Sequence, residues 1–192
     1  MWPSVVALAA SAGGVEALLA VVQGLPPDLP AAVVVVLHSG HVSHLAQVLA
    51  RRTRMTVEDV VDGRLLEPGH LYVAQPDHHV TVDAGGRLRL DESPAVRFHR
   101  PSADVLFESV AALCGVEAVG VVLSGTGDDG TRGARAIKEH GGTVLAQDDA
   151  SLFAGMPAAT VRAGLADRVL PVETMAAVIG ALARRKRDRA RG

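Results

Sequence analysis

The chain of 192 residues contains little cysteine and few aromatic residues. Its single cysteine, Cys114, excludes a disulfide framework and a zinc module built on several cysteines. Only five side chains are aromatic, namely Trp2, Tyr72, Phe98, Phe107 and Phe153. A surface that stacks single-stranded nucleic acid on aromatic rings is therefore not expected.

Long hydrophobic runs are absent as well. The longest uninterrupted apolar run, residues 31–37, has seven residues, whereas a membrane-spanning helix needs about 20. The stretch from Val5 to Ala10 is apolar, but no basic residue precedes it, so a signal peptide is not predicted. These observations predict a cytoplasmic protein whose thiol is reduced.

Basic residues are concentrated at the C-terminus. The formal net charge is −2, but residues 184–192 carry six basic side chains and one acid, which leaves 13 basic and 20 acidic side chains in residues 1–183. This acidic majority does not suggest a duplex-binding face. We expect one domain over residues 1–183 and a basic tail over residues 184–192. The tail could touch RNA or anionic lipid, or be a helix end whose cations complement the dipole.

The rest of the chain alternates between apolar strands and helices. With an apolar share of 48%, the chain is long enough for about one domain with a packed core. Continuous apolar runs indicate buried strands, and apolar residues at helical spacing indicate helices. The expected strands are residues 5–9, 32–37, 71–74, 79–82, 87–90, 118–123 and 143–147. The expected helices are residues 15–22, 42–52, 103–114, 131–140, 157–163 and 172–187.

This order of elements predicts an α/β fold, with a doubly wound, mainly parallel sheet flanked by helices in a Rossmann-like arrangement. Gly85 and Gly86 separate two short strands and predict a hairpin, so we expect a small antiparallel insert. In such a sheet, ligands bind beyond the carboxyl ends of the strands.

Polar side chains follow three of the strongest predicted strands. Ser11 follows the first and His38 follows the second. Asp128 and Asp129 lie in the loop after the strand of residues 118–123. A serine, a histidine and a carboxylate at one sheet edge are the groups of a nucleophile, a general base and an orienting acid. Taken singly, each residue has a structural alternative, as a helix cap or a solvated loop residue.

The residues after Ser11 suit a nucleophile. Gly13 and Gly14 permit a sharp turn from strand to helix, and N–H groups at a helix start point outward. Such groups can hold a developing oxyanion.

The loop after the strand of residues 118–123 also matches a dinucleotide-binding motif. Gly125, Gly127 and Gly130 match G-x-G-x-x-G between a strand and a helix, and Asp148 lies 18 residues beyond Gly130. The two acids at the variable positions would repel a pyrophosphate.

His38, His41 and His44 could suggest a metal site, but the Ser-Gly pair after His38 breaks regular structure, so no metal or cofactor is predicted.

Several segments together resemble the CheB-type chemotaxis methylesterases. The segment Leu8-Ala9-Ala10-Ser11-Ala12-Gly13-Gly14 resembles the family's nucleophile segment I-G-A-S-T-G-G, and residues 123–130 resemble its L-T-G-M-G-x-D-G loop. Further matches are Val36-Leu37-His38, His99-Arg100-Pro101-Ser102 with Asp104, Ala146-Gln147-Asp148 and Gly155-Met156-Pro157. These motifs occur in the family's order over about residues 4–180.

The resemblance implies roles for individual residues. Ser11 would be the nucleophile, His38 the general base, and Asp129, which directly precedes Gly130, the acid that orients the base. The residues implied in binding the oxyanion or the substrate are Ala12, Gly13, Thr126 and Met156. The implied reaction is hydrolysis of glutamate γ-methyl esters, with deamidation of specific glutamines as a second activity.

The implied partners are the cytoplasmic helices of methyl-accepting chemoreceptors. Residues 1–183 would be the catalytic domain, and we expect no receiver domain in this chain, no nucleic-acid partner and no insertion into a membrane. The sequence departs from the family pattern at Ala9, Ala12 and Thr126 and in the two residues after His38. A nucleotide-binding or non-catalytic signalling module with the same fold is therefore the alternative interpretation.

Overall fold

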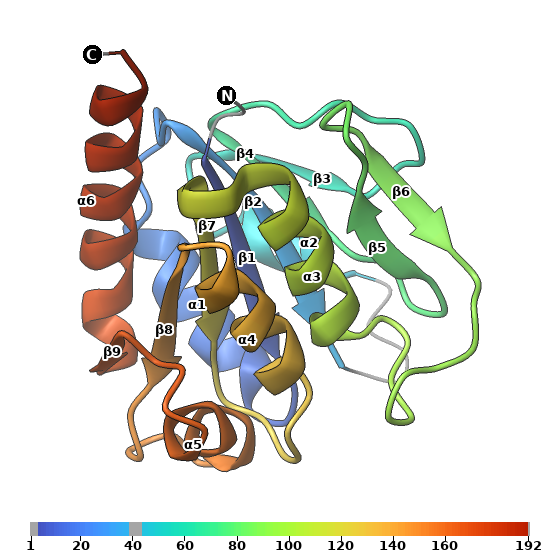
Figure 1. Cartoon of the computed structure of the whole chain (residues 1–192), viewed down its shortest axis with the longest axis vertical. Coiled ribbons are helices and arrows are strands. Elements are labelled where there is room, and N and C mark those ends of the chain that lie inside the picture. The colour runs from blue at the N-terminus through green and yellow to red at the C-terminus, as the bar shows by residue number, and fades with distance from the viewer. Residues whose placement is uncertain (1–3, 39–43, 192) are drawn as a thin grey trace.

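The chain forms one large sheet, a small second sheet and six α-helices within the part that the structure describes (Figure 1). This computed structural model describes residues 4–38 and 44–191, with side chains through residue 188. The strands are β1 (Ser4–Ala10), β2 (Ala31–Leu37), β3 (Thr56–Asp59), β4 (His70–Val73), β5 (His79–Val82), β6 (Leu88–Asp91), β7 (Ala118–Val122), β8 (Thr143–Gln147) and β9 (Arg168–Leu170). The helices are α1 (Gly14–Gly24), α2 (Leu45–Ala50), α3 (Ala103–Cys114), the short 3-10 helix η1 (Gly115–Glu117), α4 (Thr131–Glu139), α5 (Gly155–Arg162) and α6 (Val172–Arg191).

The large sheet has seven strands in the order β3-β4-β2-β1-β7-β8-β9, and all of its pairings are parallel. The antiparallel pair of β5 and β6 forms the second sheet. The fold class predicted from the sequence, a doubly wound parallel sheet with a small antiparallel insert, is therefore confirmed.

Both faces of the sheet are covered, which explains why its central strands are continuous apolar runs. Successive residues of a strand point to opposite faces. Val6, Leu8 and Ala10 of β1 therefore pack into one core with α1, α2 and α6. Val5 and Ala7 pack with α3, α4, α5 and the β5–β6 pair into the other core. Figure 1 shows α3 and α4 side by side on one face of the sheet.

The order of the strands reverses between β1 and β7. The chain leaves β1 toward α1 on one face of the sheet and leaves β7 toward α4 on the other. At such a point the two connections diverge and open a crevice at the carboxyl edge. Ser11 and the loop of residues 123–130 both begin at this crevice.

Some elements differ from the predictions. Helix α2 is shorter than the expected residues 42–52, of which residues 42 and 43 lie outside the described part. The edge strand β9 was not predicted, because its three residues are mostly exposed and carry no apolar pattern. Helix α6 continues to Arg191, and the buried Lys186 donates a hydrogen bond to the carbonyl of Val116. Among the described residues, no helix is both long and apolar enough to span a membrane.

Candidate active site

Ser11 lies directly after β1, at the turn into α1. Its backbone N–H donates to the carbonyl of Ser124 (2.9 Å), and its own carbonyl accepts the N–H of Gly14 (2.8 Å). Gly13 between them has a φ of 67°, a left-handed conformation that suits glycine. The turn is thus held on both sides, and the partly buried Ser11 stands at the carboxyl edge of the sheet.

His38 follows β2 and lies next to Ser11. The pairing of β1 with β2 ends at Ala10 and Leu37, and the N–H of His38 donates to the carbonyl of Ala10 (2.9 Å). Ser11 and His38 are therefore the first residues after two neighbouring strands, whose backbones lie about 5 Å apart. The imidazole is 5% exposed. It stacks on the ring of His99, with centroids 3.9 Å apart and planes 9° apart.

Asp129 is the carboxylate that meets His38. Its Oδ2 lies 2.8 Å from Nε2 of His38, and its side chain is 1% exposed. It accepts hydrogen bonds from Ser102 Oγ (2.8 Å) and from the N–H groups of Ala103 (2.7 Å) and Asp104 (3.1 Å). Burial acts to raise the pKa of Asp129, but His38 and the two N–H groups lower it to about 2. The side chain is therefore an ionised acceptor at neutral pH.

The contact between His38 and Asp129 has the length of an ion pair without the direction of an aligned hydrogen bond. Both ring nitrogens of His38 are buried without an aligned hydrogen-bond partner among the described residues. Catalytic hydrogen bonds are often poorly aligned before substrate binds and become shorter in the substrate complex. The distance, and not the alignment, is thus the informative feature of this pair.

Asp128, the other acid of the loop, has a different environment. Its side chain is 54% exposed and forms an ion pair with Arg97. Of the two adjacent acids, only Asp129 meets His38. The structure thus brings His38 and Asp129 into contact and places Ser11 beside them.

The four residues predicted to bind the oxyanion or the substrate lie around Ser11. Ala12 and Gly13 form the turn after it, and the carbonyl of Ala12 accepts a hydrogen bond from Ser124 Oγ (2.9 Å). Thr126 is exposed on the loop after β7. Met156 is fully buried, so its side chain supports this loop from below and does not face the open surface.

Residues 124–127 are hydrogen-bonded to the start of α5. Gly125 donates to the carbonyl of Phe153 (2.7 Å), and its own carbonyl accepts the N–H of Met156 (2.9 Å). Gly155 lies between these bonds. A Cβ at Gly155 would lie 3.0 Å from Gly125 O and Gly127 N, so any side chain there would force the two segments a few tenths of an ångström apart.

Gly155→Ala is expected to displace this loop. An added methyl group in a tightly packed place costs about 1–3 kcal/mol of stability, and we expect activity per folded molecule to fall about tenfold because the loop carries Asp129. Chemical denaturation and an ester hydrolysis assay would measure the two effects. Gly180→Ala is the matched control, since a Cβ there meets only the end of the Arg184 side chain. Wild-type activity in Gly155→Ala would contradict the expected coupling.

His99, Ser102 and Asp104 belong to the site although no role was predicted for them. His99 covers one face of the His38 ring, and burial together with the charge of His38 lowers the pKa of His99. Ser102 and Asp104 contact Asp129. The only signal in the sequence was the family motif that contains them, because local patterns do not define the path of the loop that leads through His99 and Ser102 into α3.

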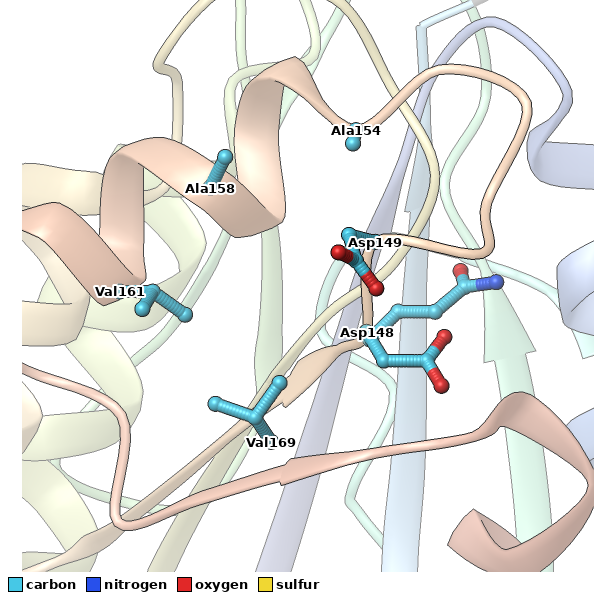
Figure 2. Close-up of a pocket in the computed structure, with 7 residues that line it drawn as sticks. Asp148, Asp149, Ala154, Ala158, Val161 and Val169 are labelled. Atoms are coloured by element: carbon cyan, nitrogen blue, oxygen red, sulfur yellow. The ribbon is translucent and has the colours of Figure 1, made fainter.

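Two hollows lie along the same edge of the sheet. One, of about 300 Å³, is bounded by the end of β8, α5 and β9, and Figure 2 shows Asp148 and Asp149 beside Val161 and Val169 there. It contains none of Ser11, His38 and Asp129. The second, of about 350 Å³, includes Gly13 and Ser124, both of which contact the turn around Ser11. The second hollow is likewise not lined by Ser11, His38 or Asp129, but it adjoins the turn that follows Ser11.

The predicted alternatives find little support in this geometry. In the dinucleotide-like loop, the N–H groups of Gly130 and Gly133 at the start of α4 donate to Asp104 Oδ1 (2.9 and 2.8 Å). A protein carboxylate thus occupies the place where a phosphate would bind. Of the histidine triplet, His41 lies outside the described residues. Within residues 4–38 and 44–191, no group of three potential ligands is placed to hold a metal ion.

The low pKa of Asp129 makes a prediction about acid stability. Because its folded pKa of about 2 lies below the ordinary 3.8, ionised Asp129 stabilises the fold above about pH 4, by roughly 2 kcal/mol. This contribution is lost as the pH falls through the folded pKa. The free energy of unfolding of wild type should therefore fall toward that of Asp129→Asn between about pH 4 and 2. If the free energies of unfolding of the two proteins changed equally with pH over this range, the low pKa of Asp129 would be contradicted.

The fold and the site together define an α/β protein of the doubly wound class, with a serine, a histidine and an aspartate gathered where its strand order reverses. The model of the CheB methylesterase family matches residues 6–179. The chain therefore belongs to the CheB methylesterase family, as its sequence motifs predicted.

Individual relatives agree with this assignment. Protein-glutamate methylesterase/protein-glutamine glutaminase 2 of Xanthomonas oryzae pv. oryzae is 40% identical over 95% of this chain and 52% of its own length. Its namesake from Pseudomonas aeruginosa is 42% identical over 91% of this chain and 52% of its own length. The chain thus spans about half the length of these curated relatives. The CheB methylesterase catalytic domain of Thermotoga maritima has a TM-score of 0.91 and 33% identity, covering 95% of this chain and all of that one.

Proposed function

We propose that this chain hydrolyses glutamate γ-methyl esters on the cytoplasmic helices of chemoreceptors and deamidates specific glutamines at the same site. The observation that carries the proposal is the buried 2.8 Å contact between His38 and Asp129, beside Ser11 on the neighbouring strand. The names of the relatives supply the substrate class. Ser11 is the nucleophile, His38 the general base and Asp129 the acid that orients the base.

In the acylation half of the reaction, His38 takes the proton of Ser11 Oγ while this oxygen attacks the γ-carbonyl carbon of the ester. Nε2 of His38 faces Asp129, which leaves Nδ1 as the nitrogen that accepts the proton. Ionised Asp129 stabilises the imidazolium that results. His38 then gives the proton to the leaving oxygen, and methanol departs.

In the second half, His38 removes a proton from water, and the resulting hydroxide attacks the acyl-serine. The proton returns to Ser11 Oγ, and a glutamate side chain is released. With a glutamine substrate the same steps release ammonia in place of methanol. The N–H groups of Ala12 and Gly13, with the exposed Thr126, hold the oxyanion in both halves. Donors of this kind contribute about 3–4 kcal/mol each in other hydrolases.

The remaining proposals concern context. We place the catalytic unit in residues 1–183, followed by the basic tail of residues 184–192. Because the substrate helices of chemoreceptors are cytoplasmic, the protein is proposed to act in the cytoplasm.

A receptor demethylation assay tests the proposed function. A cytoplasmic receptor fragment carrying tritiated methyl esters is incubated with the chain, and volatile methanol is measured. We expect methanol to be released in proportion to enzyme, with no release from a fragment whose esters have been removed by base. The proposal fails if the folded chain releases no more methanol than buffer does. A thermal shift with dinucleotides would in that case favour the nucleotide-binding interpretation.

A further inference from the structure

The helices α3 and α4 lie beside the site and exchange caps. The carboxylate that caps the start of each helix comes from the segment of the other helix. Asp129, just before α4, accepts the N–H groups of Ala103 and Asp104 at the start of α3. Asp104, in the first turn of α3, accepts the N–H groups of Gly130 and Gly133 at the start of α4. Each carboxylate thus satisfies backbone donors that have no partner within their own helix.

Asp104 is as deeply buried as Asp129. Its side chain is 0% exposed, and its Oδ1 makes both bonds to α4, at 2.9 Å to Gly130 and 2.8 Å to Gly133. Gly130 is the residue directly after Asp129 and also donates to Asp129 Oδ1 (3.0 Å). Asp104 therefore holds the backbone next to the carboxylate that meets His38.

Two buried carboxylates in contact with the same N–H group repel each other, so their arrangement needs a positive environment. Both helix N-termini point at the pair and contribute positive potential. The guanidinium Nε atoms of Arg97 and Arg132 lie 3.9 and 3.8 Å from Asp104 Oδ2, and His38 lies against Asp129. Asp104 Oδ2 makes no hydrogen bond in the described part of the chain, so Oδ1 is the atom that holds α4.

Gly133 allows the two helices to come close enough for these bonds. A Cβ there would lie 2.5 Å from Phe107 Cβ and 2.9 Å from the carbonyl oxygen of Asp104. Any larger residue at position 133 would push α4 away from α3. The place of Asp129 against His38 thus depends on the distance between the two helices.

We propose that Asp104 is a positioning residue for the esterase reaction, which fixes Asp129 against His38 by holding the start of α4 through Oδ1. This inference rests on the proposed function, because it assigns to Asp104 an effect on catalysis that acts through Asp129. It does not require Asp104 to touch the substrate.

The test compares Asp104→Ala with Asp104→Asn in the receptor demethylation assay. Asp104→Ala removes the acceptor for both N–H groups, and we expect kcat to fall about 10–100-fold, as for small displacements of catalytic groups, with KM within about twofold. Asp104→Asn keeps Oδ1 as an acceptor, so its kcat should stay within about threefold of wild type. Gly133→Ala keeps both carboxylates but separates the two helices, so we expect the same fall in kcat. This variant replaces Asp104→Ala in the test if Asp104→Ala fails to fold.

Asp167→Ala is the matched control. Asp167 also accepts a backbone N–H, from Val144 (2.8 Å), but it does so at the opposite edge of the sheet, where β8 begins. This variant should lose stability and keep the wild-type kcat per folded molecule. The rate at which a fluorophosphonate labels Ser11 is measured in all variants, because it reports the activation of the serine without the receptor.

The outcomes separate the inference from the proposed function. Wild-type kcat and labelling rate in folded Asp104→Ala would overturn the inference, as would equal losses in Asp104→Ala and Asp104→Asn. In both cases methanol release by wild type would leave the proposed function standing. If wild type releases no methanol and takes no label, the proposed function fails and the inference fails with it.

Discussion

Replacing Ser11 with alanine is expected to abolish ester hydrolysis and leave the fold intact. Loss of the nucleophile in serine hydrolases lowers kcat by about 10⁴–10⁶-fold. The contacts that shape the turn are made by the backbone of Ser11, to Ser124 and Gly14. Alanine preserves both, so circular dichroism and the melting temperature should match those of wild type.

Ser4→Ala provides the matched control on the same strand. Ser4 stands at the other end of β1, where its buried Oγ donates to the carbonyl of Glu117 (2.8 Å). Losing this bond should cost about 1 kcal/mol of stability without changing kcat. A folded Ser11→Ala variant that still releases methanol at the wild-type rate would refute the assignment of the nucleophile.

Asp129→Asn is expected to cost about 10⁴-fold in kcat, as the same change does in a serine protease triad. Oδ1 accepts from Ser102 and Asp104 and Oδ2 from Ala103, while Oδ2 also meets His38. An asparagine must turn its NH₂ group toward one of these two sets of donors. Either orientation leaves a buried donor without its acceptor, and the charge that stabilises the imidazolium is lost.

Asp128→Asn is the matched comparison, because it removes the adjacent carboxylate. Asp128 is half exposed and paired with Arg97, and exposed ion pairs contribute about 0–1 kcal/mol. We expect its kcat to stay within about threefold of wild type. Activity is measured per folded molecule, since Asp129→Asn also loses stability. Equal losses in the two variants would show that the catalytic acid is not Asp129.

Local patterns were sufficient where a strand is buried on both faces. The continuous apolar runs before Ser11 and His38 placed β1 and β2 within about a residue of their observed bounds. The parallel sheet then brought the residues that follow these strands to one edge, as the sequence predicted. The choice of Asp129 over Asp128 came from the family motif, since both acids lie in the same loop and local pattern does not distinguish them.

The features that local patterns did not predict depend on contacts between segments that are distant in the sequence. The start of α3 illustrates this, because Ser102 stands at the usual cap position but makes no side-chain cap bond to its own helix. Its hydroxyl instead donates to Asp129, 27 residues away, whose carboxylate caps the helix in its place. The strand order, the stacking of His99 on His38 and the exchange of caps between α3 and α4 arise in the same way. No local periodicity encodes them.

Covalent labelling of the serine tests the central claim most directly, because it asks whether His38 and Asp129 activate Ser11. Wild type and Asp129→Asn are treated with a fluorophosphonate, and the adduct is located by peptide mass spectrometry. The account predicts a single adduct on Ser11 in wild type, formed at least about 100-fold more slowly in Asp129→Asn. An adduct on another residue, or equal labelling rates in the two proteins, would contradict it.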